Sequence, residues 1–274
     1  MSRLGRRRGA PTVGGVNVLR CLALLLLLTF VPGLRAADKP LVVGMDLSYP
    51  PFEMRDTTGA PAGVSVDFAR AAGEFLHRPV QIENIPFAGL IPALKTGRID
   101  LIISSMTATP ERAQSIDFSE PYLRTGLCLL VGAKTGIQSI TDADGAGRSV
   151  AVVKGTTGHI YATQQLKKAR VLVLDQPASC VLEVVQGKAD AFIFDQLSNL
   201  QNWHKNPDTT RAVLAPFQAE TWAIGVRKGN DALRAGVNAF LADYGKNGGF
   251  DKLGDKWLAG QKAEFAKLGV PFVF

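Results

Sequence analysis

The stretch between residues 99 and 122, IDLIISSMTATPERAQSIDFSEPY, constrains the fold of this chain more than any other. It opens with a mainly apolar run at residues 99–103, which is short enough to form a strand buried on both faces. Thr109, Pro110 and Glu111 then have the pattern of a helix start, with a capping hydroxyl, a proline in the first position and an acid in the first turn. The stretch therefore predicts a buried strand that leads into a helix.

Hydroxyl and guanidinium groups gather at this junction. Ser104, Ser105 and Thr107 follow the strand, and Arg112 lies in the first turn of the helix. Backbone N–H groups at a helix N-terminus attract anions, and a planar guanidinium can hold a carboxylate through two parallel hydrogen bonds. Taken singly, these side chains could be ordinary turn and surface residues. In this order, they predict a site for a small anion, most simply a carboxylate.

The rest of the chain alternates strands and helices in two rounds. The first round has expected strands at 41–45, 80–85 and 99–103 and expected helices at 64–75 and 88–95. The second has expected strands at 127–131, 149–153, 171–174 and 190–194, a polar turn region at 141–148, and expected helices at 158–166, 178–186 and 196–204. Extended segments at 211–215 and 222–226 and helices at 231–246 and 249–258 complete the chain. This order predicts an α/β fold with mainly parallel sheets.

The first 36 residues have the pattern of a secretory signal peptide. Five arginines precede or flank the start of an apolar run at residues 22–31, Pro32-Gly33 then breaks any helix, and small or tolerated residues lead to a cleavage site near Ala36. Ten apolar residues are too few to span a bilayer, so an uncleaved anchor is the less favoured alternative. We expect a periplasmic protein, and the sequence leaves the export route, Sec or Tat, open.

Removal of this leader changes the charge balance. The whole chain has 31 Lys and Arg against 24 Asp and Glu, but the leader carries six arginines and no acids, so the mature part has 25 basic against 24 acidic residues, a net charge of +1. No basic surface for nucleic acid is therefore expected. Cys128 and Cys180 remain in the mature part, as a disulfide or as two buried thiols. No Cys and His spacing indicates a metal site.

Residues 104–112, with the order Ser-Ser-x-Thr-x-Thr-Pro-Glu-Arg, and residues 117–122, Asp-Phe-Ser-Glu-Pro-Tyr, resemble the signature of the periplasmic polar-amino-acid-binding proteins. These are the solute receptors of ABC importers. Residues 222–230 and Lys256-Trp257 also resemble that family, so the likeness covers nearly the whole mature chain. It implies a two-lobed periplasmic binding protein fold of type II, with the ligand cleft between lobes joined by a two-stranded hinge. The expected division is a signal peptide at 1–36, lobe 1 at 37–126, lobe 2 at 127–218 and a return segment of lobe 1 at 219–274.

Polar groups stand at four expected strand ends, where open α/β sheets bind ligands. These are Asp46, residues 104–107, the glycine-flanked loop at 155–158, and Asp195. The loop lacks the spacing of a nucleotide or dinucleotide site, although its N–H groups suit an anion. Asp195 could serve as the N-cap of the helix that follows it or as the partner of an α-ammonium group. A carboxylate clamp and an anion for the ammonium group together define an α-amino acid.

The resemblance implies a role for each candidate residue. The ligand carboxylate would contact Arg112, Thr107, Ser105 and Thr157; the ligand ammonium group Asp195 and Ser105; and the ligand side chain Asp46, Tyr49, Phe87 and Ser104. Tyr49 and Phe87 would enclose the side chain between aromatic faces, whereas Phe52 is expected to pack in the core. Gly158-His159 departs from the more polar residues often found in the family, which leaves side-chain contacts from that loop open. A polar or basic amino acid is favoured, without a choice among them.

We expect a monomeric receptor that closes on its amino acid about the hinge and delivers it to the membrane permease of an ABC importer, without cofactor, metal or enzymatic activity. The alternative is a periplasmic dehydratase of the cyclohexadienyl type, which acts on an amino-acid precursor on the same fold. A dehydratase needs a free acid or base in the cleft, and Asp46 is the only candidate that the sequence places there. A sensor domain of a membrane receptor is disfavoured because no membrane segment follows residue 36.

Overall fold

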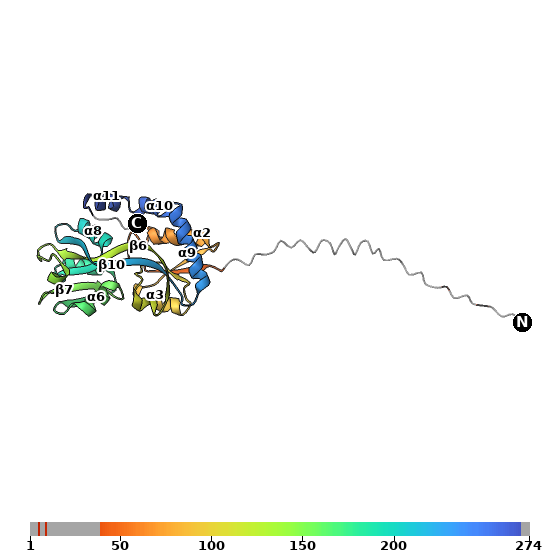
Figure 1. Cartoon of the computed structure of the whole chain (residues 1–274), viewed down its shortest axis with the longest axis horizontal. Coiled ribbons are helices and arrows are strands. Elements are labelled where there is room, and N and C mark those ends of the chain that lie inside the picture. The colour runs from red at the N-terminus through yellow and green to blue at the C-terminus, as the bar shows by residue number, and fades with distance from the viewer. Residues whose placement is uncertain (1–4, 6–8, 10–38, 270–274) are drawn as a thin grey trace. The chain divides into compact units, whose positions relative to one another are not determined.

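The computed structural model describes residues 39–269, together with the isolated residues 5 and 9 (Figure 1). The expected signal peptide and its cleavage site therefore lie outside the described residues. From Lys39 on, the chain belongs to one unit. Among residues 39–269, no helix combines the length and the apolar character that crossing a bilayer requires.

The first round of elements follows the expected order. Its members are β1 (Leu41–Met45), β2 (Met54–Arg55), β3 (Pro61–Ala62), α2 (Val64–Phe75), β4 (Val80–Asn84), α3 (Phe87–Lys95), β5 (Leu101–Ile102) and α4 (Pro110–Ala113). β1 lies between β4 and β5 and pairs in parallel with both. β5 is shorter than the expected strand at 99–103, although all the apolar residues of that run are fully buried.

The second round begins with a strand much longer than expected. Its members are β6 (Asp117–Gly132), α5 (Ile140–Ala143), β7 (Ser149–Val153), α6 (Thr157–Gln165), β8 (Arg170–Leu174), α7 (Pro177–Val185), β9 (Ala191–Asp195), α8 (Gln196–Lys205), β10 (Thr210–Val226), α9 (Asp231–Lys246), α10 (Gly249–Trp257) and α11 (Ala259–Lys267). The sequence did not predict the β2–β3 hairpin, the short helix α5 within the expected turn region, or α11. In Figure 1, β7, α6 and α8 gather in one half, and α2, α3 and α9 in the other.

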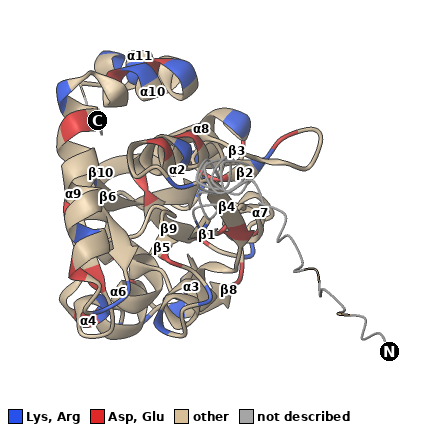
Figure 2. Cartoon of the chain, turned by 90° about the vertical axis from the view of Figure 1, so that its right-hand side faces the viewer, with Lys and Arg blue, Asp and Glu red and all other residues tan. Residues whose placement is uncertain are grey.

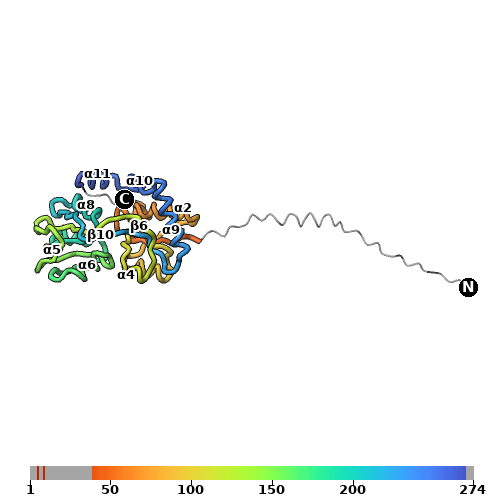
Figure 3. Tube along the Cα trace, viewed as in Figure 1, coloured from red at the N-terminus to blue at the C-terminus, as the bar shows by residue number. Residues whose placement is uncertain are grey.

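Two long antiparallel strands join the halves. The described sheet has the strand order β4-β1-β5-β10-β6-β9-β7-β8, so β10 pairs with β5 on one side and β6 pairs with β9 on the other. The expected strands at 127–131, 211–215 and 222–226 are parts of β6 and β10 (Figure 3). The register between the two strands shifts between Val213 and Gln218 and again near Ala223. The proposed lobe boundaries at 126/127 and 218/219 fall within these strands.

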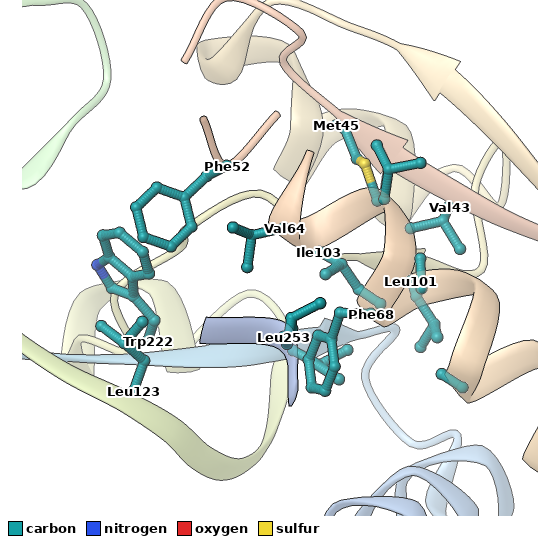
Figure 4. Packing of buried hydrophobic residues seen from close by; sticks show 14 of the residues in the cluster. Val43, Met45, Phe52, Val64, Phe68, Leu101, Ile103, Leu123, Trp222 and Leu253 are labelled. Carbon is teal, nitrogen blue, oxygen red and sulfur yellow. The ribbon is translucent and has the colours of Figure 1, made fainter. Parts of the chain in front are cut away.

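The core of the first half forms where α2 packs against the strands. Figure 4 shows Val43 and Leu101 on the strand side and Val64 and Phe68 on α2. The ring of Phe68 is almost fully buried and contacts the rings of Tyr122, Phe240, Tyr244 and Phe250. The helices α9 and α10, which follow β10 in the sequence, thus pack on the half formed by the first strands.

The last helix reaches the other half. Glu264 Oε1 of α11 lies 3.8 Å from His204 Nε2 of α8. Phe265 of α11 is buried in the same core as Leu197 and Leu200 of α8. Acidic and basic residues are interspersed along α10 and α11 (Figure 2). The return segment predicted for residues 219–274 therefore also contacts α8 at its end.

Within residues 39–269, the two cysteines are buried free thiols. Cys128 lies on β6 and Cys180 on α7. Burial raises the pKa of the Cys180 thiol to about 12, and burial also raises the pKa of Cys128. Of the two alternatives that the sequence left open, the structure has the thiols and no disulfide.

Candidate functional site

All nine residues proposed from the sequence line one pocket. They come from the ends of β1 and β9, the segment after β5, α3, α4 and the start of α6. The nine are Asp46, Tyr49, Phe87, Ser104, Ser105, Thr107, Arg112, Thr157 and Asp195. Since parallel strands on each side of the long pair β6 and β10 direct their carboxyl ends to this pocket, the sheet topology accounts for their convergence.

Arg112 is positioned by the helix start that the sequence predicted. Thr109 caps α4, and its Oγ accepts a hydrogen bond from the Arg112 N–H at 3.2 Å. The guanidinium is 7% exposed and donates from Nη1 to the carbonyl of Thr107 (2.7 Å) and from Nη2 to the carbonyl of Gly155 (3.1 Å). Burial lowers the pKa of Arg112 to about 10, so the side chain remains a cation at neutral pH. Three of its five N–H donors are free for a further acceptor.

The Gly155 contact joins the two halves of the protein. Gly155 follows β7, has a φ of +80°, and leaves so little space that an added Cβ would lie 3.1 Å from the Cβ of Ala88 on α3. Thr156 then caps α6 by accepting a hydrogen bond from the N–H of His159. The expected helix start at this loop is confirmed, and Thr157 is the first residue of α6.

Asp195 fulfils the capping role that the sequence left open. Its Oδ1 accepts hydrogen bonds from the N–H groups of Leu197 and Ser198, both at 3.0 Å, at the start of α8. The carboxyl group also lines the pocket and is 5% exposed. Burial raises its pKa, although the hydrogen bonds of the cap oppose this rise. The cap uses one oxygen, so it does not exclude ligand binding by the other.

Asp46 and Tyr49 lie at the end of the pocket formed by β1 and the following loop. The Asp46 carboxylate accepts a hydrogen bond from the N–H of Phe87 at 2.8 Å, and its own N–H donates to Ser104 Oγ at 2.9 Å. Tyr49 stacks on Phe52 at 5.2 Å, and Phe52 is buried as expected. The Tyr49 hydroxyl is close enough to Asp195 for the two to affect each other's pKa, but its geometry falls short of a hydrogen bond.

Two acidic residues in the pocket were not predicted from the sequence. Glu53 is fully buried and accepts hydrogen bonds from Ser65 Oγ (2.7 Å) and Ser105 Oγ (2.8 Å). Glu220, on β10, is 6% exposed and accepts a hydrogen bond from Thr107 Oγ at 3.1 Å. Asp46 is therefore not the only acid in the pocket, which corrects the expectation from the sequence. Glu53 enters through a local bridge with Tyr49 in the loop after β1, and Glu220 enters through the pairing of β10 with β6 and of Trp222 with Thr107.

Carboxyl groups outnumber cations among the residues that line this pocket. The acids are Asp46, Glu53, Asp195 and Glu220, and the single guanidinium is that of Arg112. Ser105, beside Glu53, has a φ of +49°, a left-handed conformation that is uncommon for a residue other than glycine. Within residues 39–269, no three His, Cys, Asp or Glu side chains come together as the ligands of a metal ion.

The pKa of Glu53 predicts that stability depends on pH. Burial raises this pKa from 4.5 to about 8, despite the hydrogen bonds from Ser65 and Ser105. Since the folded pKa exceeds the unfolded one, the stabilising contribution of the neutral group is complete below pH 4.5 and is lost as pH rises towards 8. Compared with Glu53→Gln, the native protein should therefore lose about 1–3 kcal/mol of unfolding free energy between pH 5 and pH 8.

Urea unfolding of both proteins at pH 5 and pH 8 measures this difference. Glu74→Gln, a substitution at an exposed position of α2, is the matched control and should follow the native pH profile. Parallel pH profiles for the native protein and Glu53→Gln would show that the pKa of Glu53 is the same in the folded and the unfolded state.

Comparison with known proteins identifies the family of this chain. Residues 41–260 match the family model of the bacterial extracellular solute-binding proteins, family 3. The chain belongs to this family. Its relatives include the L-arginine-binding protein of Pseudomonas aeruginosa, which is 33% identical over 82% of this chain and 90% of that protein. The L-cystine-binding protein TcyJ of Escherichia coli K12 is 29% identical over 80% of this chain and 82% of that protein.

Solved structures of family members have the same two-lobed α/β fold. The ancestral amino acid-binding protein AncCDT-1, a precursor of cyclohexadienyl dehydratase, has a TM-score of 0.74 and 35% identity, with coverage of 80% of this chain and 95% of that protein. An ancestral arginine-binding protein bound to arginine has a TM-score of 0.76 and 32% identity, with coverage of 81% and 99%. The chain is thus a periplasmic-type amino-acid-binding protein of this fold.

Proposed function

We propose that this protein is an extracytoplasmic receptor that binds one L-amino acid, with a polar or basic side chain favoured, and delivers it to the permease of an ABC importer. It acts as a monomer and without catalysis. The observation that carries the proposal is the convergence of Arg112, with three free donors, and the buried carboxyl of Asp195 in one pocket. These groups match the carboxylate and the ammonium group of an α-amino acid.

The remaining lining residues support the choice of side chain. Asp46 lies with Tyr49 and Phe87 around the pocket, and aromatic faces attract both apolar stems and cations. The excess of carboxyl groups over cations also favours a ligand that brings positive charge. Binding to arginine or other polar amino acids in several relatives agrees with this inference.

The proposed mechanism is hinge closure. β6 and β10 pass from one half to the other and have a register shift near their middle, between Val213 and Gln218, where bending would cost least. The ligand would contact groups from both halves, and its binding would shift the population towards the closed form. The hydrogen bond from Arg112 to the Gly155 carbonyl would then belong to the closed form.

A thermal unfolding assay tests the proposal directly. The mature, ligand-stripped protein is mixed with each of a panel of amino acids and with prephenate. A ligand at about 100 times its Kd adds about 2.7 kcal/mol to the unfolding free energy, which raises the midpoint by several degrees. A shift with Arg, Lys, His or Gln supports the receptor, whereas no shift with any amino acid contradicts it.

Asp46→Asn tests the side-chain end of the pocket. Asparagine can still accept the hydrogen bond from the N–H of Phe87, so the start of α3 is preserved. We expect about 10- to 100-fold weaker binding of Arg or Lys, because a charge-assisted hydrogen bond is lost, and a smaller effect on Gln. Titration calorimetry measures the affinities, and Asp175→Asn, at an exposed position after β8, is the control. Equal losses for all three ligands would remove Asp46 from side-chain recognition.

A dehydratase remains the second candidate because of Glu220. In that reaction a carboxylic acid protonates the departing hydroxyl group, which leaves as water while a substrate carboxylate leaves as CO2. Glu220 is a buried acid in the pocket; burial raises its pKa, and the charge of Arg112 opposes this rise. However, the carboxyl groups of Asp46 and Asp195 would repel the second carboxylate of a prephenate-like substrate, so the receptor is preferred. Consumption of prephenate in the assay above would establish the enzyme.

A further inference from the structure

Glu220 occupies the surroundings proposed for the ligand carboxylate. Its Oε2 accepts a hydrogen bond from Thr107 Oγ at 3.1 Å, and the hydroxyl of Thr157 and the charge of Arg112 also act on it. Of the four groups assigned to the ligand carboxylate, Thr107 therefore already bonds a carboxyl group of the protein itself, and Thr157 and Arg112 lie close enough to lower the pKa of that group. The fourth, Ser105, donates to Glu53 instead.

The charges around Glu220 do not suit a second anion. α4 contributes the cation Arg112, and the end of β9 contributes the anion Asp195; the segment before α4, the start of α6 and β10 contribute only the neutral groups of Thr107, Thr157 and Gln218. One guanidinium would thus face three carboxylates if Glu220 stayed ionised beside a bound amino acid. Like charges in one buried site raise the pKa of at least one of them.

We propose that Glu220 holds the carboxylate clamp of the ligand-free receptor and that an amino acid binds there with Glu220 protonated, so that Glu220 takes up one proton on binding. The neutral carboxyl then donates a hydrogen bond to the ligand carboxylate while Arg112 holds the charge. This inference rests on the proposed function, and it adds a specificity-determining residue to the site. Burial already raises the pKa of Glu220, while Thr157, Thr107 and Arg112 oppose that rise.

The expected result is affinity that depends on pH. Above the pKa of Glu220 in the ligand-free protein, each further pH unit lowers affinity by up to about tenfold, because a proton must be acquired for binding. Glu53 can act in the opposite sense, since a cationic ligand favours its ionised form and releases its proton. The difference between the native protein and Glu220→Gln cancels the contribution of Glu53, which is present in both.

Titration calorimetry with L-arginine at pH 6, 7 and 8, in two buffers of different ionisation enthalpy, measures both affinity and the number of protons exchanged. Glu220→Gln mimics the protonated carboxyl, so at pH 8 it should bind L-arginine at least as tightly as the native protein does. The number of protons that it takes up on binding should be lower by as much as one. Glu220→Ala should show the same loss of proton uptake without an amide that could disturb the hydrogen bonds. Glu111→Gln, which removes an exposed acid near Arg112 on α4, should behave as the native protein.

Two results would overturn the inference and leave the receptor function intact. Weaker binding by Glu220→Gln at every pH would assign Glu220 to the ligand ammonium group. If both Glu220 variants exchange as many protons on binding as the native protein, the native Glu220 side chain stays ionised and turns away from the bound ligand. If the native protein binds none of the amino acids in the thermal assay, the proposed function fails and this inference fails with it.

Discussion

Replacing Arg112 with alanine is expected to weaken amino-acid binding by about 3–5 kcal/mol, or roughly 200- to 5,000-fold, because the carboxylate of the ligand then lies in a buried pocket without its cation. The effect is large because the described lining residues supply no other positive charge. Stability should change much less, since the guanidinium bonds only two carbonyls of the protein. Titration calorimetry with the best ligand of the panel measures the loss.

Two further variants separate charge from geometry at this position. Arg112→Lys keeps the charge but not the planar fork, so its affinity should fall between those of the native protein and the alanine variant. Arg98→Ala removes an exposed arginine that pairs only with Glu83 and should bind normally. Native affinity in Arg112→Ala, with the protein folded, would show that the carboxylate clamp is elsewhere.

Local sequence patterns predicted the parts of the site that local rules determine. The capping of α4 by Thr109 follows from the residue types at the helix start, and this cap fixes the turn that carries Arg112. Asp195 comes directly after a buried apolar strand, so the topology alone places it at the ligand end of the sheet. The family resemblance supplied the residues that local rules do not single out, such as Tyr49 and Phe87, and all nine line the same pocket.

Glu220 could not be found in this way because long-range pairing brings it to the pocket, whereas Glu53 reaches the pocket through a local bridge to Tyr49 that no residue pattern announces. Glu220 lies in a polar segment of β10 whose pattern is not that of a buried strand, and it reaches the site because Thr107 pairs with Trp222 and β10 pairs with β6. The same pairing extends β6 through the polar residues near Arg124, where periodicity indicates no strand. α11 was missed because, of its nine residues, only Phe265 is buried.

The capping role of Asp195 can be separated from its role in ligand binding, because one substitution can remove the charge of the side chain and keep the N-cap of α8. Asparagine is as good an N-cap as aspartate, so Asp195→Asn should still accept the N–H groups of Leu197 and Ser198 and change stability by no more than about 0.5 kcal/mol. Its affinity for amino acids should nevertheless fall by about 2–5 kcal/mol, at least roughly 30-fold, because the buried ammonium group loses its counter-charge.

Asp195→Ala removes both functions and provides the comparison. It should lose about 0.5–2 kcal/mol of unfolding free energy from the missing cap, in addition to the loss of affinity. On the two variants, urea unfolding therefore measures the capping role of Asp195, and titration calorimetry measures its role in ligand binding. If Asp195→Asn binds amino acids as the native protein does, the cap is the whole role of Asp195, and the ammonium group must be held by another acid of the pocket, with Glu220 the first to test. If it folds normally and fails to bind, the carboxylate that begins α8 is also the one that recognises the ligand.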